Sequence, residues 1–249
     1  MNDQATIIAY LKEVDHRDPS KLIDFLEGSD FFTAPASRRY HCNYKGGLAV
    51  HTANVLYLLM VINNGCVSQK IISDSIIISA ICHDLCKVNH YVPVEENATS
   101  AQQNFARDLF GKAKKKLNPA FATNKDFCSS LIQWAKNNFE GDEPEPKQQW
   151  EIKDDFPLGH GTKSVLIASK YIELTEEEML AIKWHSGPFE TSEMEKHSYY
   201  EAMKKTPLVT MLFAADYLAT FVLEGPENSV SPNKAIELWT EMKRRDRNV

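Results

Sequence analysis

This chain of 249 residues has few of the features that would direct it to a membrane, a nucleic acid or an oxidising compartment. Its 28 lysine and arginine residues are outnumbered by 34 aspartate and glutamate residues, and the net charge of −6 argues against binding of an extended nucleic acid. No basic segment followed by an apolar stretch opens the chain, and polar residues interrupt each apolar run before it reaches a membrane-spanning length. Its five cysteines are odd in number and irregularly spaced, as in proteins with reduced thiols. We therefore expect a cytoplasmic protein that does not bind a membrane.

The sequence also lacks the long polar–apolar alternation of a sheet and has no internal repeat. Its apolar segments instead predict an all-α fold with, at most, one small β-hairpin. The expected hairpin pairs residues 149–153 with residues near 91–92. Helices are expected over 4–14, 20–27, 47–62 and 69–88, with later helices beginning near Thr162, at Thr175, near 206–207 and at 231–232.

One core is expected, because 43% of the residues are hydrophobic and the length suits a single domain over residues 1–249. Residues of about 92–149 differ in composition from the rest of the chain, with a basic run at 112–116 and an acidic, proline-rich stretch at 141–146. We interpret this interval as a helical insertion that ends in a flexible linker. It is either a solvated elaboration or a lid over a cleft.

His83 and Asp84 stand inside the apolar run of residues 76–88, which predicts a buried helix. A buried histidine and a buried carboxylate need a partner, because an unpaired charge in an apolar interior costs several kcal/mol or more. A metal ion satisfies both side chains at once, through an imidazole nitrogen and a carboxylate oxygen. This pair therefore predicts a metal site.

Further candidate ligands have equally unusual settings. His51 lies at the start of an apolar helix, and Asp216 is surrounded by core residues. His160 lies between two glycines, and His185 follows a tryptophan near another glycine. The candidate ligands along the chain are thus His51, His83, Asp84, His160, His185 and Asp216.

This order resembles the HD-domain superfamily of metal-dependent phosphohydrolases, over residues 30 to 222 or so. Four residues carry the resemblance most specifically, namely His51, His83, Asp84 and Asp216. The two extra histidines resemble the subset of that superfamily that holds two metals. The resemblance implies a helical bundle of the HD type and hydrolysis of a phosphomonoester or phosphodiester, with a nucleotide as the expected small anionic substrate.

Asp84 has two carboxylate oxygens and can bridge two ions. His51, His83 and Asp216 would then hold one ion, while His160 and His185 hold the other. Such a donor set suits Mn, Fe or Co, with Mg and Ni as further candidates. Two ions of this kind activate a water molecule, orient the phosphoryl group and neutralise the charge that develops on the leaving oxygen.

Four other residues are candidates for contact with substrate. Lys87 lies four residues after His83, one helical turn along, so its ammonium group is expected to reach the cleft and act in catalysis beside Asp84. Lys163 and Ser164 follow a turn at a helix start, where free backbone N–H groups attract anions. His41 is expected at the mouth of the pocket. The alternative for Lys87 is a side chain that runs along the helix end with its ammonium group in solvent. The alternative for Lys163 and Ser164 is ordinary helix capping.

Three classes of function remain to be compared, namely a phosphohydrolase, an oxygenase and a non-catalytic binding module. The chain has neither a G-x-S-x-G elbow nor a P-loop, which disfavours a serine hydrolase and a P-loop ATPase. Residue types alone leave a rival enzyme class, because the same ligand order with a lysine placed as Lys87 also resembles the diiron oxygenases of the HD superfamily, which act on small polar substrates. A non-catalytic module would be expected to have lost ligands, whereas all six are present.

Overall fold

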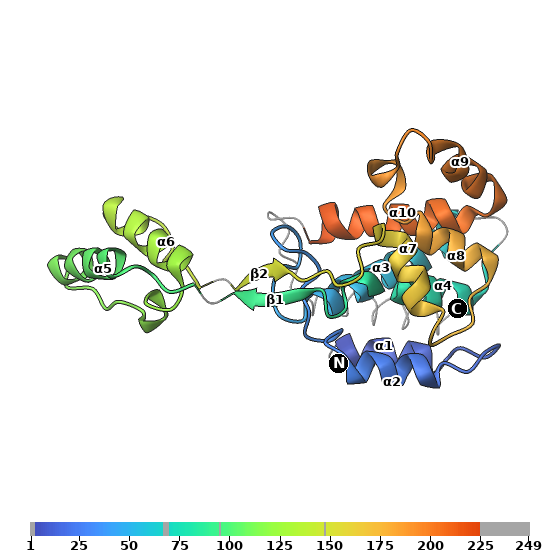
Figure 1. The fold of residues 1–249 in the computed structure, drawn as a ribbon, viewed down its shortest axis with the longest axis horizontal. Helices are drawn as coiled ribbons and strands as arrows, with labels where there is room; N and C mark the ends of the chain where they lie inside the picture. The colour runs from blue at the N-terminus through green and yellow to red at the C-terminus, as the bar shows by residue number, and fades with distance from the viewer. Residues whose placement is uncertain (1–2, 67–69, 95, 147, 225–249) are drawn as a thin grey trace. The chain divides into compact units, whose positions relative to one another are not determined.

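The computed structural model describes residues 3–66, 70–94, 96–146 and 148–224 (Figure 1). Helices dominate this part of the chain, and its strands form one two-stranded sheet. The expectation of an all-α fold with one small hairpin is therefore confirmed. The helix expected from 231–232 lies outside the described residues.

Two compact units make up the chain. The main unit contains the described residues of Met1–Tyr91 and Ile152–Val249, and the inserted unit is Val92–Glu151. The interval of about 92–149 that differs in sequence texture falls within the inserted unit.

The main unit contains helices from both of its chain segments. Its first segment forms α1 (Asp3–Leu11), α2 (Ser20–Gly28), α3 (Gly47–Cys66), α4 (Ser73–Cys82) and the 3-10 turn η1 (Leu85–Lys87). Its second segment forms α7 (His160–Ala168), α8 (Glu176–Lys183), η3 (Gly187–Glu190), α9 (Lys196–Lys205), α10 (Pro207–Leu218) and the π-helical turn η4 (Ala219–Leu223).

Helix α3 is the central element of this unit and packs against α4 and α10. By length and composition it could cross a membrane, but 61% of its apolar window is buried inside the structure, as in the core helix of a globular protein. Leu48, Val55 and Leu59 on α3 are fully buried in the same cluster as Ile78 of α4 and Leu212 of α10. The apolar character of α3 is thus explained by the core it forms.

The helix expected over residues 69–88 ends earlier in the structure. Helix α4 stops at Cys82, and Asp84 has φ −111° and ψ 20°, outside the helical range. A 3-10 turn then carries Lys87. The prediction of one continuous helix was wrong, because an apolar run that stays buried through Val88 gives no signal for the break.

Helix α8 begins with the capping box expected at Thr175, in which the Thr175 side chain accepts from the Glu178 N–H and the Glu178 carboxylate accepts from the Thr175 N–H. The fully buried Glu178 carboxylate also accepts both terminal N–H groups of Arg17, at 2.7 and 2.9 Å, and the hydroxyl of Ser75 at 2.7 Å. One carboxylate therefore ties α8 to α4 and to the segment after α1.

The inserted unit has its own core. Its chain ends lie in the strands β1 (Tyr91–Val94) and β2 (Gln149–Ile152), which pair as the two-stranded sheet. Between them lie α5 (Ser100–Lys112), η2 (Pro119–Phe121) and α6 (Lys125–Lys136). Phe110, Phe127 and Leu131 are buried in a cluster separate from that of the main unit. The side chains of Lys115 and Arg107 lie over aromatic rings at the edge of that cluster.

Candidate metal centre

Three of the predicted ligands meet where α3, the end of α4 and α10 come together. His51 on α3, His83 at the C-cap of α4 and Asp216 on α10 offer ligand atoms that all lie within 4.8 Å of one another. The Nε2 atoms of His51 and His83 are 3.3 Å apart, and His51 Nε2 is 3.2 Å from Asp216 Oδ1. His51 and His83 are fully buried. We call this set the first ligand group.

Asp84, His160 and His185 form a second ligand group within the same 4.8 Å limit. Asp84 Oδ1 lies 2.7 Å from His160 Nε2 and 3.6 Å from His185 Nε2. Its other oxygen, Oδ2, lies 3.3 Å from His83 Nε2 and 3.5 Å from His51 Nε2. The carboxylate of Asp84 therefore faces both groups, one oxygen toward each.

A glycine allows the second group to assemble. His160 is the first residue of α7, and His185 follows the end of α8. A Cβ atom at residue 161 would lie only 2.1 Å from the carbonyl oxygen of Lys183, so only glycine permits this approach of α7 to α8. The rings of His160 and His185 consequently lie 5.0 Å apart, centroid to centroid.

Hydrogen bonds on the far side of three rings fix their tautomers. The Nδ1–H of His83 donates to the Ala80 carbonyl and that of His185 to the Ile182 carbonyl, each at 2.7 Å. The Nδ1–H of His51 donates to the carboxylate of Glu224 at 3.1 Å. Because those acceptors occupy Nδ1, the Nε2 lone pairs of the three rings point into a space that they share with carboxylate oxygens. This is the orientation of metal-binding histidines.

The charges around this space attract positive charge. Burial lowers the pKa of His51, but Glu224 and Asp216 outweigh it and raise that pKa to about 10, so its Nε2 binds a proton that a bound metal ion would replace. For His160, burial lowers the pKa and the neighbouring Cys86 and Asp84 raise it well above its ordinary value. Burial raises the pKa of Asp84, yet Lys87 and His83 bring it well below the usual range. The carboxylates are thus ionised, and the donor set of imidazoles and carboxylates can hold a metal ion.

Glu224 is a functional candidate that the sequence did not indicate. Burial raises the pKa of its carboxyl, but the charge of His51 and hydrogen bonds from His51 and Asn54 lower it to about 2. Asn54 donates to Glu224 Oε1 at 2.7 Å. Glu224 also belongs to a third set of mutually close donors with His41 and His51. Since the Nδ1–H of His51 already donates to Glu224, we infer that the Glu224 carboxylate orients the His51 ring.

Lys87 lies within the cluster as predicted. It does not reach the cluster from the same helix as His83, because it lies on the 3-10 turn that follows. Its Nζ donates to Asp84 Oδ2 at 2.6 Å, and its side chain is 11% exposed. Burial lowers its pKa, but Asp84 raises it above the ordinary value, so the ammonium group is charged. The 3-10 turn after Asp84 brings the two side chains together.

The remaining predicted contacts have protein partners or lie beside the cluster. Lys163 Nζ donates to Asp154 at 2.6 Å, and the fully buried Ser164 hydroxyl accepts from the Cys86 N–H at 3.1 Å. The ring of His41 lies 4.8 Å from that of His51, and its Nε2 is buried without a hydrogen-bond partner among the described residues. Contact of these three with a substrate stays a prediction.

No family model, curated protein or solved structure matches this chain. The assignment of the centre therefore rests on its geometry alone. That geometry is a buried cluster of histidine and aspartate side chains, in two groups that share the neighbourhood of Asp84 and can hold metal ions.

Proposed function

We propose that this chain is a metal-dependent phosphohydrolase of the HD-domain type, with two divalent cations at the centre. One observation carries the proposal: the Nε2 atoms of three imidazoles, with their protons held on the opposite nitrogen, converge with the oxygens of Asp84 and Asp216. Such a convergence of acceptors needs cations.

The first ligand group and the second would each hold one ion, with Asp84 between them. Bound cations supply activation of a water molecule and neutralisation of the phosphoryl oxygens. Mn²⁺, Fe²⁺ and Co²⁺ suit the imidazole and carboxylate donors best, with Mg²⁺ and Ni²⁺ as alternatives.

The protein side chains have separate tasks in this reaction. Asp84 keeps its two oxygens toward the two groups, and the Lys87 ammonium group neutralises it at 2.6 Å. The same ammonium group is placed to donate to a phosphoryl oxygen when substrate enters. His160 and Asp216 are the members with exposed side-chain area, 27% and 21%, so substrate reaches the centre past them.

The test is turnover of a panel of phosphomonoesters and phosphodiesters, with Mn²⁺, Co²⁺, Fe²⁺ or Mg²⁺ supplied and released phosphate or phosphomonoester as the readout. The active substrate is then turned over without O₂ in ¹⁸O-labelled water. A hydrolase incorporates the label into the released phosphoryl group and works with Mn²⁺ or Mg²⁺. Strict dependence on O₂ and iron, with no ester cleaved, would contradict the proposal and identify the diiron oxygenase class instead.

A further inference from the structure

A cavity of about 310 Å³ opens beside Asp216 in the main unit. Its walls come from the segment after α8, from α10 and from η4. The lining residues are Ser186, Phe189, Phe213, Asp216, Tyr217, Thr220 and Phe221.

Aromatic rings dominate this cavity, and two of them are largely exposed. Phe189 is 72% exposed and Phe221 is 63% exposed, which is unusual for two large apolar side chains that both lie beside the same ring, that of Tyr217. The Phe189 ring is nearly parallel to that of Tyr217, at 12° with centroids 5.9 Å apart. The Tyr217 and Phe221 rings are 4.6 Å apart. The wall of the cavity is therefore a set of ring faces and edges that could contact another flat ring.

The local backbone is shaped to hold these rings together. Gly187 has φ +64°, a conformation that side-chain-bearing residues rarely adopt. A Cβ atom at that position would lie 2.5 Å from the ring of Phe213. The glycine therefore lets the segment after His185 close onto α10, where the Phe189 ring reaches Phe213 and Tyr217.

The cavity adjoins the metal centre at two of its own lining residues. Asp216 lines the cavity and also lies 3.2 Å from His51 Nε2 in the first ligand group. Ser186 lines it too, and its hydroxyl is 3.4 Å from His185 Nε2 in the second group. A molecule with one end at the centre can therefore place its other end among the aromatic rings.

We infer that this cavity is a substrate-binding subsite for a flat heteroaromatic ring of nucleobase size, attached to the phosphoester whose phosphoryl group binds at the metal centre. The inference rests on the proposed function for the phosphoryl end only. Stacking on aromatic side chains tolerates any such ring, while the hydroxyls of Ser186 and Thr220 offer hydrogen bonds to its edge. A cavity of about 310 Å³ matches a small ligand, not the long groove that a partner helix would need.

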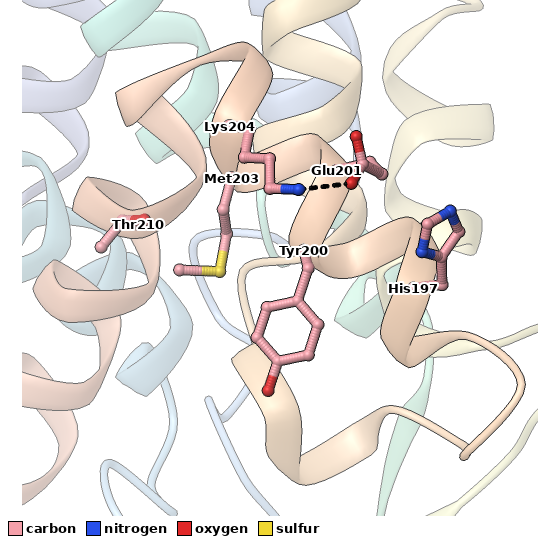
Figure 2. A pocket seen from close by; sticks show the side chains of 6 residues that line it. All are labelled: His197, Tyr200, Glu201, Met203, Lys204 and Thr210. Atoms are coloured by element: carbon pink, nitrogen blue, oxygen red, sulfur yellow. Dashed lines mark hydrogen bonds and ion pairs between the residues drawn. The ribbon is translucent and has the colours of Figure 1, made fainter.

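A second cavity serves as the internal comparison (Figure 2). It has a volume of about 530 Å³ and is lined by His197, Tyr200, Glu201, Met203, Lys204 and Thr210 of α9 and α10. Its Tyr200 is 55% exposed, but none of its lining residues belongs to either ligand group. Its ion pair between Lys204 and Glu201 lies within α9, as Figure 2 shows. Tyr200 is therefore a matched exposed aromatic residue away from the proposed subsite.

The experiment measures binding of nucleosides, which carry the ring but no phosphate, to the full chain after chelation. Calorimetric titrations with adenosine, guanosine, cytidine and uridine are compared with a titration with ribose. At least one nucleoside is expected to bind measurably better than ribose. Phe189→Ala and Phe221→Ala should weaken its binding roughly 10- to 100-fold, as loss of one stacking partner does. Phe221→Tyr should retain it, and Tyr200→Ala should leave it unchanged.

Circular dichroism and metal content, unchanged in each variant, would show that the fold and the centre are intact. Failure of every nucleoside to bind better than ribose at millimolar concentration would overturn the inference, as would equal binding by Phe221→Ala. Self-association of the wild-type chain that Phe221→Ala abolishes, without nucleoside binding, would assign the surface to a protein interface instead. Nucleoside binding without any phosphoester cleavage would leave the subsite standing and refute the phosphohydrolase.

Discussion

Glu178 and Asp84 are both buried carboxylates of the main unit, but their surroundings differ in kind. Glu178 receives hydrogen bonds from two N–H groups of Arg17, from the Ser75 hydroxyl and from the Thr175 N–H. Asp84 has the Lys87 ammonium group and is otherwise surrounded by four imidazoles, three of which have their Nδ1–H engaged elsewhere. The comparison shows that fixed hydrogen-bond donors surround the Glu178 carboxylate, whereas the Asp84 carboxylate faces imidazoles that could hold a metal ion together with it. The ion pair and hydrogen bonds of Glu178 stabilise the fold, and the perturbed groups around Asp84 mark a candidate functional site.

Replacement of Asp84 should give the largest effect. Asp84→Asn keeps the shape but removes the charge that faces both ligand groups, so phosphoester hydrolysis should fall by more than about 100-fold, the upper end for residues that only support a ligand. Steady-state assays and circular dichroism would follow activity and helical content. Asp155→Asn, at an 80% exposed side chain, is the matched control. Full turnover by Asp84→Asn would contradict the proposal that the Asp84 cluster is a catalytic metal centre.

Replacement of Arg17 should affect the fold and spare the centre. Arg17→Ala leaves the buried Glu178 without its cation, and the free energy of unfolding should fall by about 3 kcal/mol. Urea unfolding measures this loss, and elemental analysis of the folded variant should find its metal content unchanged. Loss of metal without loss of stability would contradict the comparison, because Arg17 would then support the Asp84 cluster and not the fold.

Glu224→Gln should have a smaller and more selective effect. The amide still accepts a hydrogen bond from His51 but no longer carries the charge, so Mn²⁺ affinity should weaken by about 10- to 100-fold. Calorimetric titration should show this loss with the number of ions at saturation retained. Glu201→Gln, on the surface of α9, provides the control. An unchanged affinity would show that the charge of Glu224 does not strengthen His51 as a metal ligand.

Asp74 provides a third, weaker case. This buried carboxylate accepts from the backbone N–H of His16 at 2.9 Å and from its ring at 3.0 Å. Burial raises the pKa of Asp74, but these hydrogen bonds lower it overall. Its stabilisation is therefore present above the unfolded-state pKa, near 4, and is lost as the pH falls through the lower folded-state value. Asp74→Asn should cost about 1 kcal/mol at pH 7 and progressively less in acid, as measured by urea unfolding at each pH. A difference independent of pH would contradict this.

The sequence predicted the members of the cluster better than the backbone that holds them. His83, Asp84 and Asp216 could be singled out because polar residues in apolar runs need partners, and His160 because glycines flank it. The break after Cys82 could not be read, because buried apolar residues continue on both sides of it. That break, rather than helical spacing, brings Lys87 to Asp84.

Other features had signals of unequal strength. The start of α5 was not predicted, although Thr99 and Gln102 have the residue types and spacing of the capping box that the structure forms. Glu224 had no such signal, since it becomes a neighbour of His51 only when η4 follows α10 and leads the chain to α3. A contact across 173 positions depends on tertiary packing, which local pattern does not encode.

The most direct test of the central claim is the number of metal ions that each chain binds. Purified protein would be saturated with Mn²⁺, dialysed and analysed by elemental analysis, alongside His51→Ala and His160→Ala. We expect two ions per wild-type chain and one in each variant, because each substitution removes a ligand from one group and leaves the other group in place. A wild-type chain that binds no ion, or variants that both keep two, would contradict the assignment of the Asp84 cluster as a two-metal centre.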